Sequence, residues 1–136
     1  MSDSAVEAFL RDQGTGVLSL ATDNRAYGVP VSFAYLGSDR CLLDLGFGPN
    51  STKRTMIEAT ETACLTAHEW TSPVRWQSVV MFGLLEERDA LDPDEEQRFF
   101  DQAADVEISV FGASPETVEL RWFDFRIEEI TGREAP

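Results

Sequence analysis

The chain contains one lysine, Lys53, in a turn whose residue types suit a bound anion. The turn follows the apolar segment 41–45 and a Gly-Pro-Asn sequence, and it leads into a helix that we expect over residues 52–60. Free backbone N–H groups and the positive end of the helix dipole both favour a negative charge at the start of a helix. The position of Lys53 therefore predicts a phosphate site at this turn.

The neighbours of Lys53 add further groups that can bind a phosphate. Ser51 and Thr52 supply hydroxyls, and Arg54 supplies a second cation. The alternative is ordinary helix capping by Asn50 or Ser51, with two solvated cations beside the cap. The turn is not a P-loop, which requires Gly directly before the lysine and Ser or Thr directly after it.

His68 is the only histidine, at the end of an expected strand. It could be a haem ligand, a general base or a hydrogen-bonded strand-end residue. The last is favoured because one histidine without a second has no metal-ligand spacing, and haem is the one metal group for which a single imidazole would suffice. The sequence predicts no metal site, and no nucleophile lies in a context that indicates hydrolysis.

The charge balance excludes two classes of partner. Lys and Arg number 11 against 25 Asp and Glu, which gives a net charge of −14 and a pI near 4.2. Such a chain is repelled by nucleic acids and by anionic membrane surfaces, so neither is an expected partner. An acidic chain so poor in lysine resembles cytosolic proteins of salt-loving microbes, because at molar salt the Debye length falls to ~3 Å and screens the self-repulsion.

The length of 136 residues and the apolar content of 43% predict a single domain over residues 1–136 with one core. The sequence shows neither a signal peptide nor an apolar run of about 20 residues. Cys41 and Cys64 lie in apolar runs and are expected to be reduced core residues. We therefore expect a cytoplasmic protein.

Hydrophobic patterning predicts six strands joined by short helices. The expected strands cover residues 16–22, 26–35, 40–47, 62–69, 75–88 and 117–130, and the expected helices cover residues 4–12, 52–60 and 92–104. Ser4 and Glu7 have the spacing of a capping box. The segment 106–114 has no clear pattern, and residues 133–136 are expected to be a frayed tail.

Three local features qualify this pattern. Pro30 interrupts an expected strand, so its position should be an edge, a bulge or a place where the backbone faces a ligand. Gly83 predicts a bulge or bend. The acidic clusters 86–87 and 92–96 are expected to be solvated surface.

Because no βαβ alternation occurs, the sequence predicts a mainly β fold, a six-stranded antiparallel β-barrel with two or three short helices.

With these residues in place, the chain resembles the pyridoxamine 5'-phosphate oxidase-like flavoproteins, the FMN-binding split barrels. The resemblance extends from Gly16 to Arg133. It rests on five segments in the same order and at similar spacing, residues 16–22, 27–33, 51–54, 76–83 and 129–133.

The resemblance implies a split barrel that forms a homodimer, with FMN in each of two grooves between the subunits. Val31 and Ser32, with their flanking backbone, would lie along the flavin ring. The phosphate would be held by Ser51, Thr52 and Lys53. The ring would be approached from the other subunit by Trp76, Gln77 and Ser78.

The chain also departs from the oxidases that act on the phosphorylated vitamin. Those enzymes carry a basic strand before the lysine turn and C-terminal Arg and His residues that clasp the substrate phosphate, whereas the segment 41–45 here has no cation and the C-terminus has only Arg133. We therefore expect an FMN-dependent oxidoreductase acting on a different small molecule or electron donor. The alternative is a non-catalytic flavin- or haem-binding protein for storage, sensing or delivery on the same scaffold.

Overall fold

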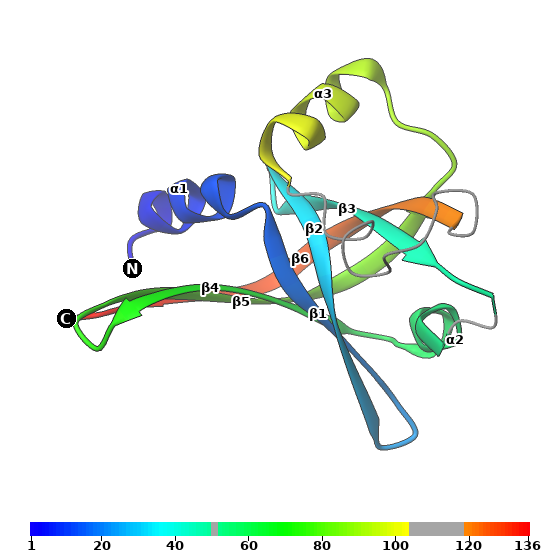
Figure 1. Cartoon of the computed structure of the whole chain (residues 1–136), viewed down its shortest axis with the longest axis horizontal. Coiled ribbons are helices and arrows are strands. Elements are labelled where there is room, and N and C mark those ends of the chain that lie inside the picture. Colours follow the sequence, from blue (N-terminus) through cyan, green and yellow to red (C-terminus); the bar gives the residue numbers. More distant parts are fainter. Residues whose placement is uncertain (50–51, 104–118) are drawn as a thin grey trace.

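The chain folds into a six-stranded antiparallel barrel with three helices in the part that the computed structural model describes, residues 1–49, 52–103 and 119–136 (Figure 1). The strands lie in the closed order β1-β2-β3-β6-β5-β4. This confirms the prediction of a mainly β, six-stranded split barrel with two or three short helices. The elements are α1 (Asp3–Gln13), β1 (Thr15–Thr22), β2 (Arg25–Gly37), β3 (Arg40–Phe47), α2 (Thr52–Ala59), β4 (Ala63–Ser72), β5 (Arg75–Arg88), α3 (Pro93–Gln102) and β6 (Glu119–Glu134).

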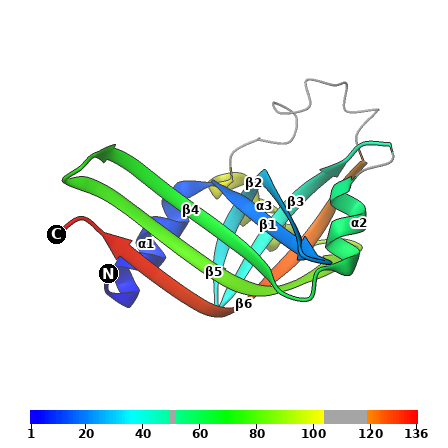
Figure 2. The same ribbon diagram turned by 90° about the horizontal axis from the view of Figure 1, so that it is seen from below.

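The strands β4, β5 and β6 extend beyond the barrel as a long ribbon (Figure 2). The second half of β6 pairs with β5 alone, up to the pair Gln77 and Glu134. The expected frayed tail from Arg133 is therefore wrong for residues 133 and 134. These residues stay in the strand because β5 offers them a complete ladder, and the N–H of Ala135 donates to the carbonyl of Trp76 at 3.0 Å.

The core fills the barrel with the inward side chains of every strand. Leu18, Val31, Leu43, Leu65 and Phe125 are among its fully buried members. In these strands apolar inward residues alternate with outward ones, as the pleat of a β-strand requires. Helices α1 and α2 bury apolar residues of their own in the same cluster.

The N-terminal helix begins at a different serine from the one expected. The N-cap is Ser2, whose Oγ accepts a hydrogen bond from the N–H of Ala5 at 3.2 Å, so the capping box expected from Ser4 and Glu7 is wrong. The helix therefore begins one residue earlier than expected, which places Asp3 at the positive end of its dipole. The helix lies directly on β6, because a Cβ built on Gly132 would come within 2.6 Å of Val6.

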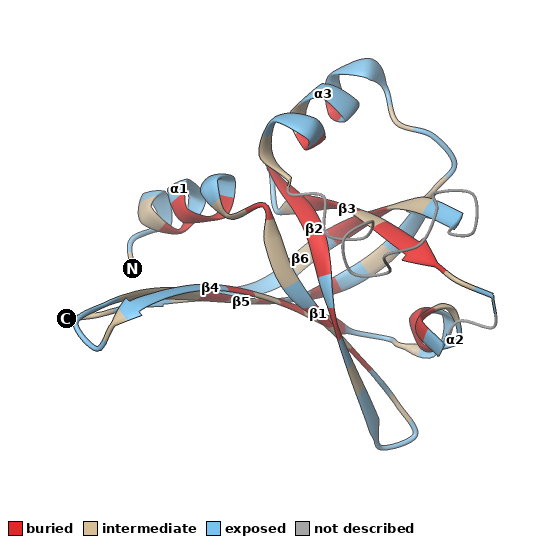
Figure 3. Ribbon diagram, in the orientation of Figure 1, coloured by how far each residue is buried: buried red, intermediate tan, exposed pale blue. Residues whose placement is uncertain are grey.

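Helix α3 covers the outward face of β2, β3 and β6. Phe99 packs there with Ala34, Leu36 and Leu42, and its ring meets that of Trp122 edge to face at 4.9 Å. In Figure 3, β2 and β3 are mostly buried, whereas the outer ribbon of β4 and β5 is exposed or half-buried near its tip. One outward face of the barrel is therefore closed by the chain itself.

A charged cluster secures α3 to three strands. Glu95 of α3 accepts hydrogen bonds from Arg88 at 2.9 Å and contacts Arg40 at 3.0 Å, and Asp124 contacts the same two arginines at 3.2 and 3.1 Å. The expectation that the acidic cluster 92–96 is solvated is wrong for Glu95, which is 6% exposed. The Arg88 hydrogen bond, the Asp92 N–H and Arg40 lower the pKa of Glu95 to about 2.

The start of α3 agrees with the sequence pattern. Asp92 is the N-cap, Pro93 opens the helix, and Asp92 and Glu95 form a reciprocal capping box. The unassigned segment 106–114 and the expected start of the last strand at residue 117 lie outside the described residues.

Two predictions about irregular strand positions also hold. The ladder between β5 and β6 shifts register between Phe82 and Gly83, where a Cβ would come within 2.1 Å of the Arg126 carbonyl. Pro30 pairs with Val17 of β1, but the ladder between β2 and β3 begins only at Ser32. Pro30 therefore occupies an edge position, where a missing N–H is tolerated. Within the described part of the chain, no helix has the length and apolar character needed to cross a membrane.

Candidate functional site

The Lys53 turn connects the end of β3 to the start of α2. Lys53 is 2% exposed, and its Nζ donates a hydrogen bond to the carbonyl of Gly46 at 2.8 Å and lies 5.8 Å from the ring centre of Phe47. Thr52 is exposed in the first turn of the helix. Ser51, the third residue expected to hold the phosphate, lies outside the described residues, as does Asn50. The Lys53 ammonium is thus held beside the start of α2, and the start of a helix is the end that favours an anion.

The second cation of this turn makes ion pairs within the protein. Arg54 pairs with Glu87 of β5 at 2.8 Å and with Glu58 at 3.6 Å, and it stacks over Phe47 at 4.9 Å. Glu87 also pairs with Arg121. These contacts brace α2 against the barrel, so Arg54 acts as a structural cation at this turn.

Val31 and Ser32 lie on β2 with their side chains on opposite sides of the sheet. Val31 is fully buried in the core, so only its backbone can face a ligand. Ser32 is 3% exposed and lies on the outward side, between Thr15 of β1 and Asp44 of β3. The sequence pattern could place both residues on one strand but could not tell which of them points into the core.

Trp76, Gln77 and Ser78 lie at the start of β5, near the tip of the ribbon. Because successive residues of a strand face opposite sides, Trp76 and Ser78 share one face and Gln77 the other. The Gln77 amide lies 3.5 Å from Glu134, and Trp76 and Gln77 both line a hollow of about 350 Å³ at the ribbon tip. Trp76 therefore shares a hollow with Gln77 and a face of the ribbon with Ser78.

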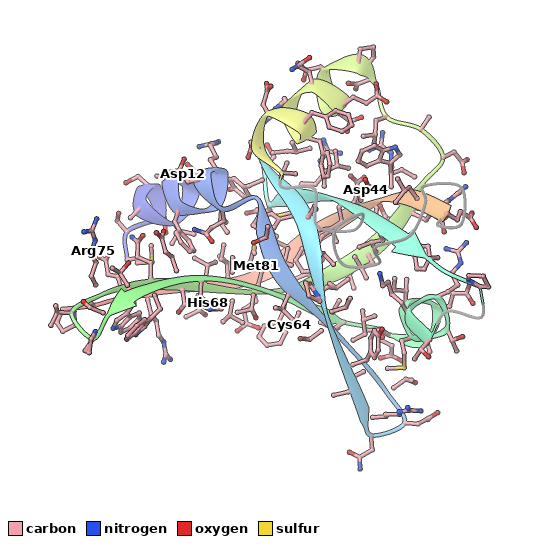
Figure 4. The ribbon with its side chains drawn as sticks, viewed as in Figure 1. Asp12, Asp44, Cys64, His68, Arg75 and Met81 are labelled. Atoms are coloured by element: carbon pink, nitrogen blue, oxygen red, sulfur yellow. The ribbon has the colours of Figure 1, made fainter. Side chains whose placement is uncertain are left out.

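The predicted phosphate-binding turn at Lys53 and the predicted ring-contacting segment at Trp76 lie at opposite ends of the folded molecule. Figure 1 shows α2, which carries Lys53, at one end of the long axis and the turn between β4 and β5 at the other. In Figure 4, Arg75 marks the far end of the ribbon. One chain therefore does not bring Trp76, Gln77 and Ser78 to the Lys53 turn.

The outward side chains of β1, β4, β5 and the end of β6 form a second outward face, which we call the open face. Strand register aligns Pro30, Val17, Thr66, Val80 and Thr131 in one row across five strands. The next row contains His68, Ser78 and Arg133. Val17 and Phe82, 38% and 42% exposed, show that this face is uncovered in the single chain.

Two hollows lie on the open face. One, of about 220 Å³, is lined by Thr15, Gly16, Val17, Pro30, Thr66 and His68. The other, of about 350 Å³, is lined by Ser78, Val80, Thr131 and Arg133. Among these residues, the sequence predicted Ser78 as a site residue and singled out Pro30 and His68 as possible ligand contacts. The others could have been found only by aligning the strands in register, which a single sequence does not specify.

His68 lies on β4 between Arg75 and Cys64 (Figure 4). Its side chain is exposed, and it makes no hydrogen bond or ion pair to another described side chain or backbone group. The expected strand-end position is wrong, because β4 continues to Ser72 and His68 lies within it, and the expected hydrogen bond is not present within the described residues. The imidazole therefore faces the hollow between β1 and β4.

The cysteines and acids that the structure describes do not form a metal site. Cys41 and Cys64 are both free thiols, and burial raises the pKa of the Cys41 thiol far above its ordinary value, so it stays protonated. Among residues 1–49, 52–103 and 119–136, no three His, Cys, Asp or Glu side chains are grouped as metal ligands.

Solved structures similar to this chain include flavin proteins. The chain is 27% identical to a FAD-binding protein from Mesorhizobium loti, with a TM-score of 0.70 over 100% of this chain and 96% of that one. A FAD-binding protein from Mycobacterium smegmatis is 20% identical, with a TM-score of 0.66 over 99% of this chain and 96% of that one. A flavocytochrome from Azotobacter vinelandii is 15% identical, with a TM-score of 0.68 over 99% and 68% of the two chains.

At 20% and 15% identity, the last two similarities concern the fold alone. No curated protein matches the chain. The model of one protein family, described as pyridoxamine 5'-phosphate oxidase, matches residues 2–134. Because this match covers nearly the whole chain, the protein belongs to the pyridoxamine 5'-phosphate oxidase family.

Proposed function

We propose that this protein is a flavoprotein that binds FMN between two copies of the chain and acts as an oxidoreductase on a small molecule. The family match over residues 2–134 carries the proposal. The FAD-binding protein from Mesorhizobium loti, similar over 96% of its length, supports a flavin as the ligand. FMN is the specific proposal because Lys53 and the start of α2 offer one phosphate site.

The geometry of the single chain supports assembly of the site from two copies. The Lys53 turn and the Trp76 segment lie at opposite ends of the molecule, so a second chain is needed to bring them together. The open face carries exposed apolar side chains that a second copy would cover. A homodimer with a cofactor groove at each end of its interface satisfies both observations.

The open face also has the chemistry that a flavin ring requires. The row from Pro30 to Thr131 and the row from His68 to Arg133 contain no carboxylate, although the chain carries 25 acids. A flat ring can approach such a surface closely without meeting a buried negative charge.

The residues of this chain would bind and orient the cofactor. The helix start at Thr52, with Lys53, would hold the phosphate, and the backbone around Val31 and Ser32 would lie along the ring, as would Trp76 and Ser78 of the second copy. When bound, the flavin supplies the hydride or electron transfer. The two chains together would exclude water from the groove.

The cofactor can be tested on the purified protein. We expect a yellow protein with an oxidised-flavin spectrum, from which heat releases FMN that chromatography separates from FAD and riboflavin. The spectrum should bleach with NADH, NADPH or a reduced deazaflavin and recover in air. A colourless protein that does not take up added flavin would refute the proposal, and a flavin that no donor reduces would favour a storage or sensing role.

The phosphate site can be tested by the substitution Lys53→Met. Charge-assisted contacts to a partly buried anion are worth ~1.5 to 3 kcal/mol, so FMN affinity should fall roughly tenfold to a hundredfold while riboflavin affinity stays the same. The control Arg25→Met makes the same change of net charge at the exposed start of β2. If Lys53→Met keeps full FMN affinity, or loses riboflavin equally, Lys53 is not the phosphate partner.

The same proposal includes the setting in which the protein works. We propose a cytoplasmic protein adapted to high salt, because its net charge of −14 is carried by a chain of 15.2 kDa with one lysine.

A further inference from the structure

The hollow between β1 and β4 is lined by polar and apolar residues, and no Asp, Glu, Lys or Arg is among them. Its hydrogen-bonding side chains are Thr15, Thr66 and the imidazole of His68, and the other lining residues are Gly16, Val17 and Pro30. Gly16 allows the two strands to approach closely here, since a Cβ at this position would come within 2.8 Å of the Thr66 carbonyl. The hollow is thus a shallow, built pocket with hydroxyls at its sides.

This hollow lies between the two sets of residues proposed to contact the flavin. Ser78 is the cross-strand partner of His68 on β5, and Ser32 is the partner of Thr15 on β2. Neighbouring strands are ~4.8 Å apart, so both lie within a few strand spacings of the imidazole. A molecule that sits in the hollow would therefore lie beside the proposed ring.

The charges around the hollow disfavour an anionic occupant. Neither Arg nor Lys lines it, and the protein as a whole is strongly acidic. The one arginine on this row, Arg133, lines the other hollow, two strands away from His68 across β5. A phosphorylated or carboxylate ligand would lose its hydration here without gaining a cation, which is a large cost.

We propose that the hollow between β1 and β4 is the substrate pocket of the flavin site, that it takes a neutral, unphosphorylated ring compound with a carbonyl group, and that His68 hydrogen-bonds that carbonyl. This inference rests on the proposed flavin function and adds the class of substrate to it. An imidazole N–H can donate to a carbonyl oxygen, and the threonine hydroxyls can hold a neighbouring amide or hydroxyl. The unphosphorylated class separates this chain from oxidases of the phosphorylated vitamin.

The test uses the only histidine as a spectroscopic probe. Flavin-loaded protein is titrated with nicotinamide and, in a matched experiment, with nicotinate, which has the same ring but a carboxylate. Neither compound attacks a thiol, so the nearby Cys64 does not interfere. We expect nicotinamide to shift the ring-proton NMR signal of His68 in a saturable way, with a Kd at least tenfold lower than that of nicotinate.

Substitutions in the hollow complete the test. His68→Leu and Thr66→Val should each weaken nicotinamide at least several-fold, measured by quenching of flavin fluorescence or absorbance change, while Thr71→Val, on the same strand but outside the hollow, should not. The unfolding midpoint and the flavin content of each variant verify that the fold and cofactor are kept. A His68→Leu variant with unchanged nicotinamide affinity would overturn the proposal.

Two other outcomes are also decisive. Equal or tighter binding of nicotinate, lost on Arg133→Gln, would overturn the proposal and assign an anionic ligand to the other hollow. Absence of any His68 shift in a protein that holds one flavin per chain refutes the pocket but leaves the flavin function standing. A protein that binds no flavin refutes the proposed function itself, so the two failures are distinguishable.

Discussion

The barrel has two outward faces, of which one is covered by a helix of the same chain and the other is exposed. On β2, β3 and β6, α3 buries Phe99 against Leu42, and a cluster of two arginines and two carboxylates locks the helix in place. On β1, β4 and β5, the outward side chains Val17 and Phe82 remain exposed, and neither hollow is lined by a carboxylate. The first face completes the fold, and the second is suited to a ligand and another chain.

The largest effect is expected from Glu95→Ala, on the stability of the closed face, which is the outward face of β2, β3 and β6 that α3 covers. Removing this buried carboxylate leaves Arg40 and Arg88 with Asp124 alone, and loss of one member of a buried charged cluster costs about 3–5 kcal/mol. The control is Glu96→Ala, an exposed acid of the same helix, which should change stability by no more than about 0.5 kcal/mol. Urea unfolding measures both. Equal effects would mean that the cluster contributes no more than surface charge.

The pH dependence of the same cluster gives the next largest effect. The pKa of Glu95 is lowered from 4.5 to about 2 by hydrogen bonds from Arg88, from the Asp92 N–H and from Arg40. A lowered folded-state pKa adds stability that is complete above pH 4.5 and is lost as the pH falls through 2. At 1.36 kcal/mol per pH unit, the loss is on the order of 3 kcal/mol. Unfolding curves of the wild type and Glu95→Gln should converge toward pH 2, and a constant difference from pH 7 to 2 would contradict the assignment.

On the open face, Phe82→Glu should break assembly rather than folding. A charge at the centre of an apolar contact is unfavourable in both copies, and truncation of a large interface aromatic is typically worth ~2 kcal/mol or more, which raises the dimer dissociation constant roughly thirtyfold. Phe100→Glu is the matched control, because Phe100 of α3 is 68% exposed on the closed face. Light scattering measures the mass of each variant. If both variants, or neither, become monomers, the open face is not the interface.

An increase in salt concentration should have the smallest effect on thermal stability, and this effect should not distinguish the two faces. The net charge of −14 makes self-repulsion general, and screening it should raise the melting temperature by a few degrees, equivalent to about 1 kcal/mol, between dilute and molar KCl. A flat or falling melting temperature would contradict the high-salt proposal.

The sequence predicted what is local and missed what depends on register. The bulge at Gly83 and the helix start near Pro93 were correctly predicted because they depend on few neighbours, although the capping box predicted for Ser4 and Glu7 was wrong. Glu95 was expected to be solvated, because no local pattern shows that Arg40, Arg88 and Asp124 converge on it from three strands. In the same way, burial of Val31 and of Lys53 follows from the sheet that surrounds them.

The most direct test of the account is sedimentation of the flavin-loaded protein with detection at both the protein and the flavin wavelength. We predict that all flavin absorbance moves with a particle of twice the 15.2 kDa chain mass, at one flavin per chain, and that Phe82→Glu shifts the protein to the single-chain mass and releases the flavin. Full flavin occupancy on a 15.2 kDa particle would contradict the claim that two copies build the site.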